Sequence, residues 1–508
     1  MATQLLTEKY ADSLDGVLGC FDRIVITGSL AELCYAKGMT SYLYGHDIRI
    51  FDYPRFAEPL RDEIRTNAEA LARSEGLEIE FIRKKDFRKE DRIQAILAQR
   101  GHQPGLVHIF SAMEPCASYK PWHDKVSGHT FLKSDSGKCL HYYFYFIDAE
   151  LGLCYLRVPT WCPFRLQFYC NGHARLARQL AQQQIAYTAL DNAFGQLGDY
   201  AQANQLAAQW DCPWLHHKLD AWASQYCPVV NTLHFSYYWS LMQVEYALDL
   251  VFKRPAALAA FYPHLLETLI HAVKPQDIAT FLGKKLHGNY QGEVGNNLNT
   301  RIQGTRIRHH MGPAAIKMYD KFGRILRIEV TVNDVAFFQQ HREVAHRNGE
   351  RETKWAPMQK TICSLAPLRE LLGAATQRYL AFLSEIETPE LGVQALNQLT
   401  QTQVHDQHRY KGLTLLSEED ASVFRLLLHG EFTISGFTNK ALRQGLPGQT
   451  SAQVSRLLKR LRMHKLIKKV GLRYKYYLTD FGRQVAALVL KLRERHIIPA
   501  LAQAPEPA

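Results

Sequence analysis

One stretch of the chain, residues 284–334, gathers polar side chains more densely than a protein core requires. Residues 316–319 and 325–332 within it have the pattern of two strands and predict a hairpin. Apolar and polar residues alternate along the second strand, so one of its faces is polar. The side chains of this hairpin that could do chemistry are Tyr319, Asp320, Lys321, Arg327 and Glu329.

Residues 304–330 resemble one class of plasmid rolling-circle replication initiators. In that class a Gly-x-Arg approach, an apolar-x-Tyr-Asp-Lys strand and an apolar-Arg-x-Glu strand recur. The matching residues are Gly304, Arg306, Tyr319, Asp320, Lys321, Leu326, Arg327 and Glu329. A second initiator class carries a His-hydrophobic-His pair, whereas His309 and His310 are adjacent here, so the resemblance is to the first class alone.

The resemblance implies a metal-dependent, strand-nicking endonuclease in which Tyr319 attacks a DNA phosphodiester. A phenolate is a competent nucleophile once nearby charge lowers its pKa. Lys321 or Arg327 would neutralise the phosphorane. Glu329, together with Asp320, would hold Mg²⁺ or Mn²⁺, because hard carboxylate oxygens suit these ions. The alternative is a hairpin that binds a DNA or RNA backbone without cutting it.

A second feature is the charge near the C-terminus. Residues 431–496 contain 15 Lys and Arg against three Asp and Glu, a net charge of +12, which equals the charge of the whole chain. A basic surface concentrated in one small segment is typical of a nucleic-acid binder.

The order of elements in this basic segment is specific. Ser417 can cap one helix, Thr438 a second, Ser451 a third that runs to Met463, and Thr479 a last one. Residues 466–470 and 474–478 predict a hairpin before that last helix. The order resembles the winged helix-turn-helix of MarR-like bacterial regulators.

That resemblance implies that the helix from Ser451 to Met463 lies in the major groove of duplex DNA. Gln453, Ser455 and Arg456 would face base edges, and Arg462 also points outward. Phosphate contacts, which position the protein without specifying sequence, would come from a basic set. Its members are Lys459, Arg460, Lys468, Lys469, Arg473 and Lys475, with Arg306 and Arg308 as further candidates in the body. A solvated basic face, or a winged helix used for protein contacts, is the alternative.

The length of 508 residues predicts two to four domains. Strands at 22–28, 49–51, 77–82 and 106–110 alternate with helical patterns, which favours an α/β layer with some parallel pairing. The fold class predicted is α+β or mixed α/β, multidomain. Its parts are an α/β domain at 1–115, a mixed β-sheet body at 116–395 with a helical insertion near 173–272, a linker at 396–416, the winged helix at 417–496 and a disordered tail at 497–508.

Other residues are weaker candidates. Glu114 follows an expected strand and could act as an acid, although a surface carboxylate is the simpler interpretation. Glu245 and Asp249 lie four apart on a predicted helix at 239–252, and such a pair either binds a metal or belongs to a solvated face. Strands rich in aromatic residues follow Lys138, and their rings either stack on unpaired bases or fill the core.

Several classes are not indicated. No run of 18 apolar residues exists, residues 1–15 lack a signal-peptide pattern, and no Cys-x-x-Cys pair suggests a zinc finger. We therefore expect a cytoplasmic, bacterial-type protein with reduced thiols and no membrane partner. A simple repressor needs no body of this size, so a DNA-processing role of the mobile-element or replication-initiator type is favoured. Duplex DNA is the expected partner, single-stranded DNA or RNA further partners, and an oligomer is compatible with the sequence. A non-catalytic transcriptional regulator and a structured-RNA-binding protein are the alternatives.

Overall fold

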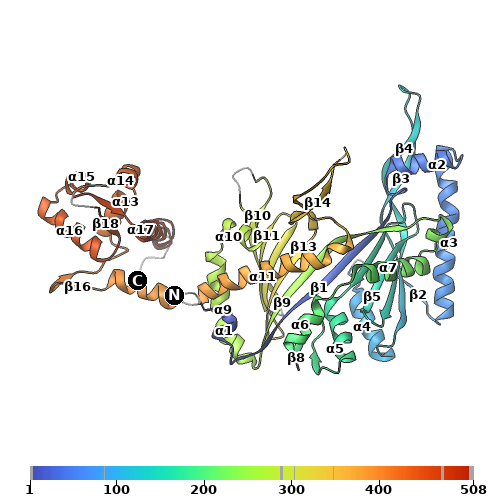
Figure 1. The fold of residues 1–508 in the computed structure, drawn as a ribbon, viewed down its shortest axis with the longest axis horizontal. Coiled ribbons are helices and arrows are strands. Elements are labelled where there is room, and N and C mark those ends of the chain that lie inside the picture. Colours follow the sequence, from blue (N-terminus) through green and yellow to red (C-terminus); the bar gives the residue numbers. More distant parts are fainter. Residues whose placement is uncertain are drawn as a thin grey trace. The chain divides into compact units, whose positions relative to one another are not determined.

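The computed structural model describes residues 4–84, 86–286, 290–301, 304–346, 348–387, 389–470 and 474–502. The chain divides into two compact units, Met1–Glu387 and Thr388–Ala508, which are called the body and the terminal unit below. Figure 1 shows the helices and strands of both units. Each unit has its own hydrophobic core.

An eleven-stranded sheet runs through the described part of the body in the order β10-β11-β12-β13-β9-β1-β6-β5-β4-β3-β2. Its strands are β1 (Leu14–Leu30), β2 (Ile79–Phe81), β3 (Gly105–His123), β4 (Thr130–Asp148), β5 (Gly152–Pro159), β6 (Leu166–Cys170), β9 (Tyr237–Phe252), β10 (Val294–Arg301), β11 (Gly304–Met311), β12 (Ala314–Lys321) and β13 (Ile325–Val332). Only β2 and β3 pair in parallel among them; all other neighbours are antiparallel. The structure thus confirms a mixed α/β architecture with a large mixed sheet.

The sheet repeats one strand order. In the first half a long strand, β1, lies beside the last strand of the meander β3-β4-β5-β6. In the second half β9 lies in the same way beside β13, the last strand of β10-β11-β12-β13. The long strands β1 and β9 pair with each other, so the two halves meet at the centre of the sheet.

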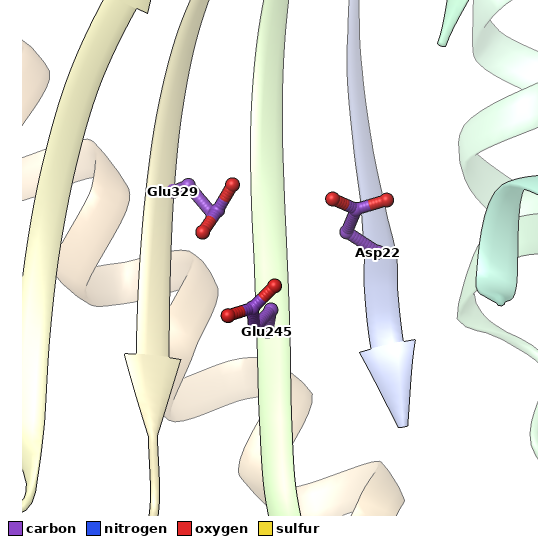
Figure 2. A group of neighbouring side chains, drawn as sticks. All are labelled: Asp22, Glu245 and Glu329. Carbon is purple, nitrogen blue, oxygen red and sulfur yellow. The ribbon is translucent and has the colours of Figure 1, made fainter. Parts of the chain in front are cut away.

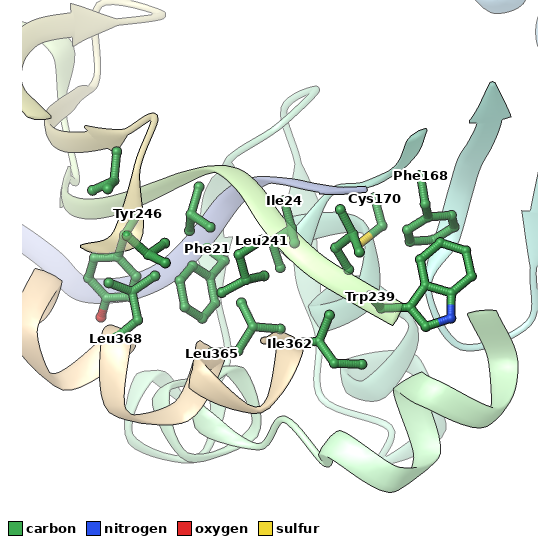
Figure 3. Packing of buried hydrophobic residues seen from close by; sticks show 14 of the residues in the cluster. Phe21, Ile24, Phe168, Cys170, Trp239, Leu241, Tyr246, Ile362, Leu365 and Leu368 are labelled. Carbon is green, nitrogen blue, oxygen red and sulfur yellow. The ribbon is translucent and has the colours of Figure 1, made fainter. Parts of the chain in front are cut away.

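Helices cover the two faces of the sheet unequally. The main core lies on one face, against α3 (Tyr53–Ser74), α7 (Cys212–Tyr226), α9 (Pro255–Ala272), α10 (Pro275–Phe281) and α11 (Leu365–Glu387). Phe21, Tyr246 and Leu368 pack together in it (Figure 3). We call this the apolar face. The other face carries Arg23, Glu245, Lys317 and Glu329 and is called the polar face.

Smaller clusters cover part of the polar face. They involve α4 (Lys89–Arg100), α5 (Gly172–Gln182) and α6 (Tyr200–Ala208). The remaining elements of the body are α1 (Leu6–Lys9), α2 (Ala36–Gly45), the 3-10 turns η1 (Ile50–Asp52), η2 (Val335–Phe337) and η3 (Ile362–Ser364), α8 (Val229–Thr232), and the hairpins β7 (Tyr187–Ala189) with β8 (Phe194–Leu197) and β14 (Gln339–Ala345) with β15 (Arg351–Pro357).

The structure corrects three predictions about the body. Residues 237–252 form a strand, not a helix. A β-bulge between Leu241 and Gln243 shifts the alternation of apolar and polar residues by one position, which hides the period of two. Residues 50–52 form a 3-10 turn rather than a strand. Residues 1–115 are no separate domain, since β1 lies at the centre of the common sheet.

The terminal unit contains α12 (Pro389–Thr400), the hairpin β16 (Gln403–His405) with β17 (His408–Tyr410), α13 (Glu418–Leu427), α14 (Gly430–Ser435), α15 (Asn439–Gln444), α16 (Ser451–Met463), the hairpin β18 (Ile467–Lys469) with β19 (Tyr476–Leu478), α17 (Asp480–Leu492), the π-turn η4 (Arg493–Ile497) and α18 (Ile498–Ala502). Ser417, Thr438 and Thr479 cap their helices as predicted, whereas Thr450 rather than Ser451 caps α16. The end of helix α12 and the hairpin β16–β17 lie in the predicted linker, 396–416, and α12 begins before it. Helix α18 begins inside the predicted tail, whose residues 503–508 lie outside the described residues.

The cysteines differ from expectation at one pair. Cys212 in α7 and Cys363 in η3 are joined by a disulfide, while the other eight cysteines are free thiols. In the described part of the chain, the helices are either too short or too polar to cross a membrane.

Candidate functional site

Three carboxylates converge at the centre of the polar face. Asp22 comes from β1, Glu245 from β9 and Glu329 from β13, three neighbouring strands, and each offers an oxygen within 4.8 Å of the others (Figure 2). A β-bulge lies between Phe21 and Arg23. Because a bulge adds one residue to a strand, Asp22 and Arg23 can both face the polar side. We call Asp22, Glu245 and Glu329 the carboxylate triad.

A buried arginine ties one end of the triad to the fold. The fully buried Arg327 donates two hydrogen bonds of 2.6 Å to Asp249 and lies 3.3 Å from Asp22. Burial alone would raise the pKa of Asp249, but the charge of Arg327 outweighs it and lowers that pKa to about 2. Arg327 therefore serves to position Asp22 and Asp249 and has no free edge for a substrate.

Asp22 has further partners from the segment after β6. Asn171 and Asn192 donate to its oxygens at 3.2 and 2.8 Å, and His173 Nδ1 lies 3.3 Å away. Burial opposes ionisation of Asp22, but His173 and Arg327 outweigh it and hold the pKa well below its ordinary value. Asp22 is thus a fixed, charged oxygen ligand.

The other end of the triad holds the tyrosine. The Tyr319 hydroxyl donates to Glu329 Oε2 at 2.7 Å, and Lys317 Nζ lies 2.5 Å from Glu329 Oε1 and 3.5 Å from Glu245. Burial, and then the neighbouring Glu329, raise the pKa of Glu245 and of Tyr319. Two carboxylates this close favour a cation between them, and the Lys317 ammonium supplies part of that charge.

The triad fits a hard divalent cation. Three carboxylate groups can supply several oxygens to Mg²⁺ or Mn²⁺, which also keep bound waters. Three carboxylates beside the single ammonium of Lys317 leave room for a further positive charge at this point. Of the two metal ligands expected from the sequence, Glu329 belongs to this triad. Asp320 does not, because adjacent residues of a strand point to opposite faces and Tyr319 occupies the polar face.

The residues of the hairpin β12–β13 that the sequence predicts for the site therefore do not all lie at the triad. Tyr319 is half-buried at the triad, and Lys321 lies beside Asn192, with its pKa lowered by burial and then by Arg327. Arg306 lies directly opposite Tyr319, and Arg308 directly opposite Lys317, on β11. Both arginines thus share the polar face with the tyrosine.

The sequence pattern missed most partners of the triad. Asp22, Glu245 and Asp249 come from strands far from the hairpin, and Asn171, His173 and Asn192 come from a loop and a helix start. The four-residue spacing of Glu245 and Asp249 was the available signal, because residues i and i+4 share a face in a strand as well as in a helix. That spacing does not show which strands lie beside the one that carries Glu245 and Asp249.

A second tyrosine–glutamate pair lies in the first half of the sheet. Tyr143 on β4 donates to Glu114 at 2.6 Å, and Arg157 on β5 lies 2.7 Å from the same carboxylate. Burial opposes ionisation of Glu114, but the Tyr143 and Arg157 hydrogen bonds lower its pKa. Among the described residues, no group of three possible metal ligands includes Glu114, so the pair lacks the ligand set of the triad.

The basic and polar residues predicted to contact DNA in the terminal unit differ in their exposure and in their partners within the chain. Gln453, Ser455, Arg456, Lys459, Arg462 and Lys468 are exposed, and Lys469 and Lys475 are half-buried. Gln453 closes a capping box with Thr450, and Ser455 accepts a hydrogen bond from Asn439. Arg460 is held by Asp420 at 3.1 Å and by two backbone carbonyls, so it braces α16 against α13 and the hairpin β16–β17. Arg473 lies outside the described residues.

Comparisons with known proteins assign the chain to no family. No family model matches the chain, and no curated protein matches it. Among solved structures, the NADPH-bound class II 3-hydroxy-3-methylglutaryl-CoA reductase from Streptococcus pneumoniae is similar at 9% identity over 90% of this chain and 80% of that chain, with a TM-score of 0.18. A likeness this weak carries no argument about fold or function.

Proposed function

We propose that the protein is a DNA-processing enzyme that binds duplex DNA through its terminal unit and transfers a DNA strand to Tyr319 in its body. The observation that carries the proposal is the Tyr319 hydroxyl bonded to Glu329 within a triad of carboxylates. A tyrosine of the hydrophobic core has no need of such surroundings. The role is of the replication-initiator or mobile-element type.

The chain's own groups can perform the transfer. Glu329 accepts the Tyr319 proton as the phenolate oxygen attacks phosphorus, and the bond from phosphorus to the leaving sugar oxygen breaks. The leaving sugar oxygen takes up a proton from water, and the proton that Glu329 accepted passes to solvent, so that charge and protons balance. Lys317, already at Glu329, lies close enough to neutralise charge on the phosphoryl oxygens. Arg327 holds the triad in place through Asp22 and Asp249.

A divalent cation held by Asp22, Glu245 and Glu329 would supply Lewis-acid polarisation of the phosphoryl group and would lower the pKa of nearby hydroxyls. Mg²⁺ and Mn²⁺ suit an all-oxygen ligand set.

The terminal unit supports the duplex-binding part of the proposal. Its element order, α15, α16, the hairpin β18–β19 and α17, resembles that of a winged helix-turn-helix, in which α16 would enter the major groove. Arg456 and Lys459 on α16, and Lys468 on the hairpin, are exposed for contact. Arg460 is not part of this surface, because Asp420 already holds it.

The decisive experiment seeks a covalent adduct. Full-length protein is incubated with end-labelled random-sequence single strands, duplexes or RNA, with and without Mn²⁺, and adducts that resist detergent are counted on a denaturing gel. We expect a Mn²⁺-dependent DNA adduct that Tyr319→Phe abolishes. Tyr143→Phe is the matched control, because that tyrosine also donates to a glutamate, and it should keep the adduct. A wild-type protein that forms no adduct on any DNA would refute strand transfer.

The duplex-binding part is tested separately by salt dependence. Lys459→Ala/Lys468→Ala should weaken duplex binding and reduce the slope of log affinity against log salt by about 1.8, the value for two lost phosphate contacts. Arg483→Ala/Lys491→Ala, on the exposed side of α17, removes the same charge and should leave the slope unchanged. Equal losses in both variants would indicate nonspecific charge attraction rather than a defined surface.

A further inference from the structure

Strand β11 presents a row of nitrogen donors without partners. On its polar face Arg306, Arg308 and His310 are half-buried, and each has a buried nitrogen that finds no hydrogen-bond partner among the described residues. These atoms are the Nε of both arginines and Nδ1 of His310. A buried donor left unpaired costs about 1–3 kcal/mol, and more when it is charged. The row is therefore suited to an acceptor-rich anion that comes from outside the chain.

The row lies next to the candidate nucleophile. Arg306 is directly opposite Tyr319 and Arg308 directly opposite Lys317 across the β11–β12 ladder. Side chains opposite each other in an antiparallel ladder have Cβ atoms about 4.5–5.5 Å apart. An anion bound by the two arginines would thus lie one strand away from the Tyr319 hydroxyl.

A fourth unpartnered nitrogen lies on the far side of the triad. Arg23 on β1 is directly opposite Glu245, and its buried Nε also has no hydrogen-bond partner among the described residues. Its guanidinium lies 5.4 Å from the centre of the Tyr169 ring. Unpaired arginine donors therefore flank the carboxylates on both sides.

Arg23 also lines a groove of about 1130 Å³ on the polar face between α4 and α5. The half-buried Tyr169 lines it and is backed at 5.1 Å by the stacked ring of Tyr155, which is buried like Tyr145 beside it. Tyr187 is 36% exposed at its margin. The groove exceeds the roughly 300–1,000 Å³ of a small-ligand site. Aromatic groups beside a cationic track are typical of sites for unpaired bases, whereas a duplex keeps its bases paired.

We propose that an unpaired DNA strand crosses the polar face, with phosphates on Arg306 and Arg308 on one side of the triad and on Arg23 on the other. One or more of its nucleotides occupy the groove between α4 and α5. From β11 to β6 the path crosses five strand intervals, or about 24 Å. That length accommodates about seven nucleotides at the 3.4 Å spacing of a stacked strand. The inference rests on the proposed function and assigns the substrate of the same site.

The first test measures binding without cleavage. Labelled oligo-dT and a labelled duplex are titrated with full-length Tyr319→Phe protein in the absence of divalent metal. Adding Arg306→Gln/Arg308→Gln should weaken oligo-dT binding about tenfold or more, since hydrogen bonds to charged groups contribute strongly. It should also lower the salt slope by about 1.4. Duplex affinity should not change. Arg55→Gln/Arg65→Gln, on the exposed side of α3, is the control and should bind oligo-dT normally.

The second test locates the strand without a variant in the path. Oligo-dT that carries 5-iododeoxyuridine is cross-linked to the Tyr319→Phe protein by light, and the modified peptides are identified by mass spectrometry. Adducts at Tyr169 or Tyr187 support the path, and adducts confined to residues after 388 overturn it. Normal oligo-dT binding by the double arginine variant would overturn it too, even if the Tyr319-dependent adduct forms. If the double arginine variant loses oligo-dT binding but the wild-type protein forms no covalent adduct, the proposed path is supported and strand transfer is refuted.

Discussion

The residue that most constrains the site is Arg327, because it is fully buried and two buried carboxylates balance its charge. Its guanidinium bonds both oxygens of Asp249 and reaches Asp22 and the Asn192 carbonyl. Burial acts to lower the pKa of Arg327, but Asp249 outweighs it and holds that pKa well above its ordinary value. Removing one member of such a pair leaves the other charge buried and unpaired, which costs more than the pair itself contributes.

We therefore predict that Arg327→Met lowers the free energy of unfolding of the body by about 3–5 kcal/mol. The measurement is urea unfolding followed by tryptophan fluorescence. Adding Asp249→Asn to that variant should restore part of the loss, since the orphaned carboxylate disappears. Arg327→Lys should also be destabilising, because a lysine cannot make the bidentate contact. A loss below 1 kcal/mol in the single variant would contradict the buried-pair description.

At the scale of elements, the start of α5 is held unusually close to β1. A Cβ placed on Gly172 would lie 2.1 Å from the backbone oxygen of Phe21, so only glycine allows this approach. The residues on either side, Asn171 and His173, are the ones that contact Asp22. The contact between helix and strand therefore fixes one ligand of the triad.

Gly172→Ala should push α5 away from β1 and destabilise the body by about 1–3 kcal/mol, as overpacking does. It should also reduce the Mn²⁺-dependent adduct more than the loss of stability explains, because Asn171 and His173 leave Asp22. Urea unfolding and the adduct assay check the two effects. Gly45→Ala, at a position with open space within 4 Å, is the control and should change neither. Full adduct formation by folded Gly172→Ala protein would contradict this role of α5.

The same scale shows what the sequence could and could not predict. The hairpin β12–β13 was predictable because its two strands are adjacent in sequence and each alternates on one face. The strand β9 was not, since a β-bulge between Leu241 and Gln243 shifts its alternation and the apolar Ala247 and Val251 lie on its other face. The helix caps of the terminal unit were predictable from local hydrogen bonding alone.

The same difference between local and long-range contacts decides which residues of the site could be predicted. Tyr319 and Glu329 could be proposed together because their strands are joined by a short turn. Asp22 could not, because its contact with Arg327 spans 305 positions and depends on the order of strands in the sheet. Sheet order between distant strands is set by burial and packing, which no local pattern encodes. The placement of Asp320 failed for a simpler reason, namely that neighbouring strand residues face opposite ways.

For the whole molecule, the repeated strand order gives the body two similar halves with different polar residues. The first half carries one tyrosine–glutamate pair, Tyr143 with Glu114, beside arginine. The second half carries the pair of Tyr319 with Glu329 and gains Asp22 across the central β1–β9 contact. The triad therefore exists only because both halves contribute to it. A change in the pairing of β1 with β9 would dismantle the site without touching the hairpin.

The division into two compact units predicts two separate unfolding transitions. All seven tryptophans lie between Trp122 and Trp355, in the body, so their fluorescence reports the body alone, whereas far-ultraviolet circular dichroism reports both units. Phe424 is 1% exposed in the core of the terminal unit, and Phe424→Ala should cost that unit about 3–5 kcal/mol. In urea the dichroism should then show an earlier first transition, while the fluorescence midpoint stays at the wild-type value, because independent cores unfold independently. A fluorescence midpoint that shifts with the dichroism would mean that the two units unfold as one, and that duplex binding and strand transfer cannot be assigned to separate parts of the chain.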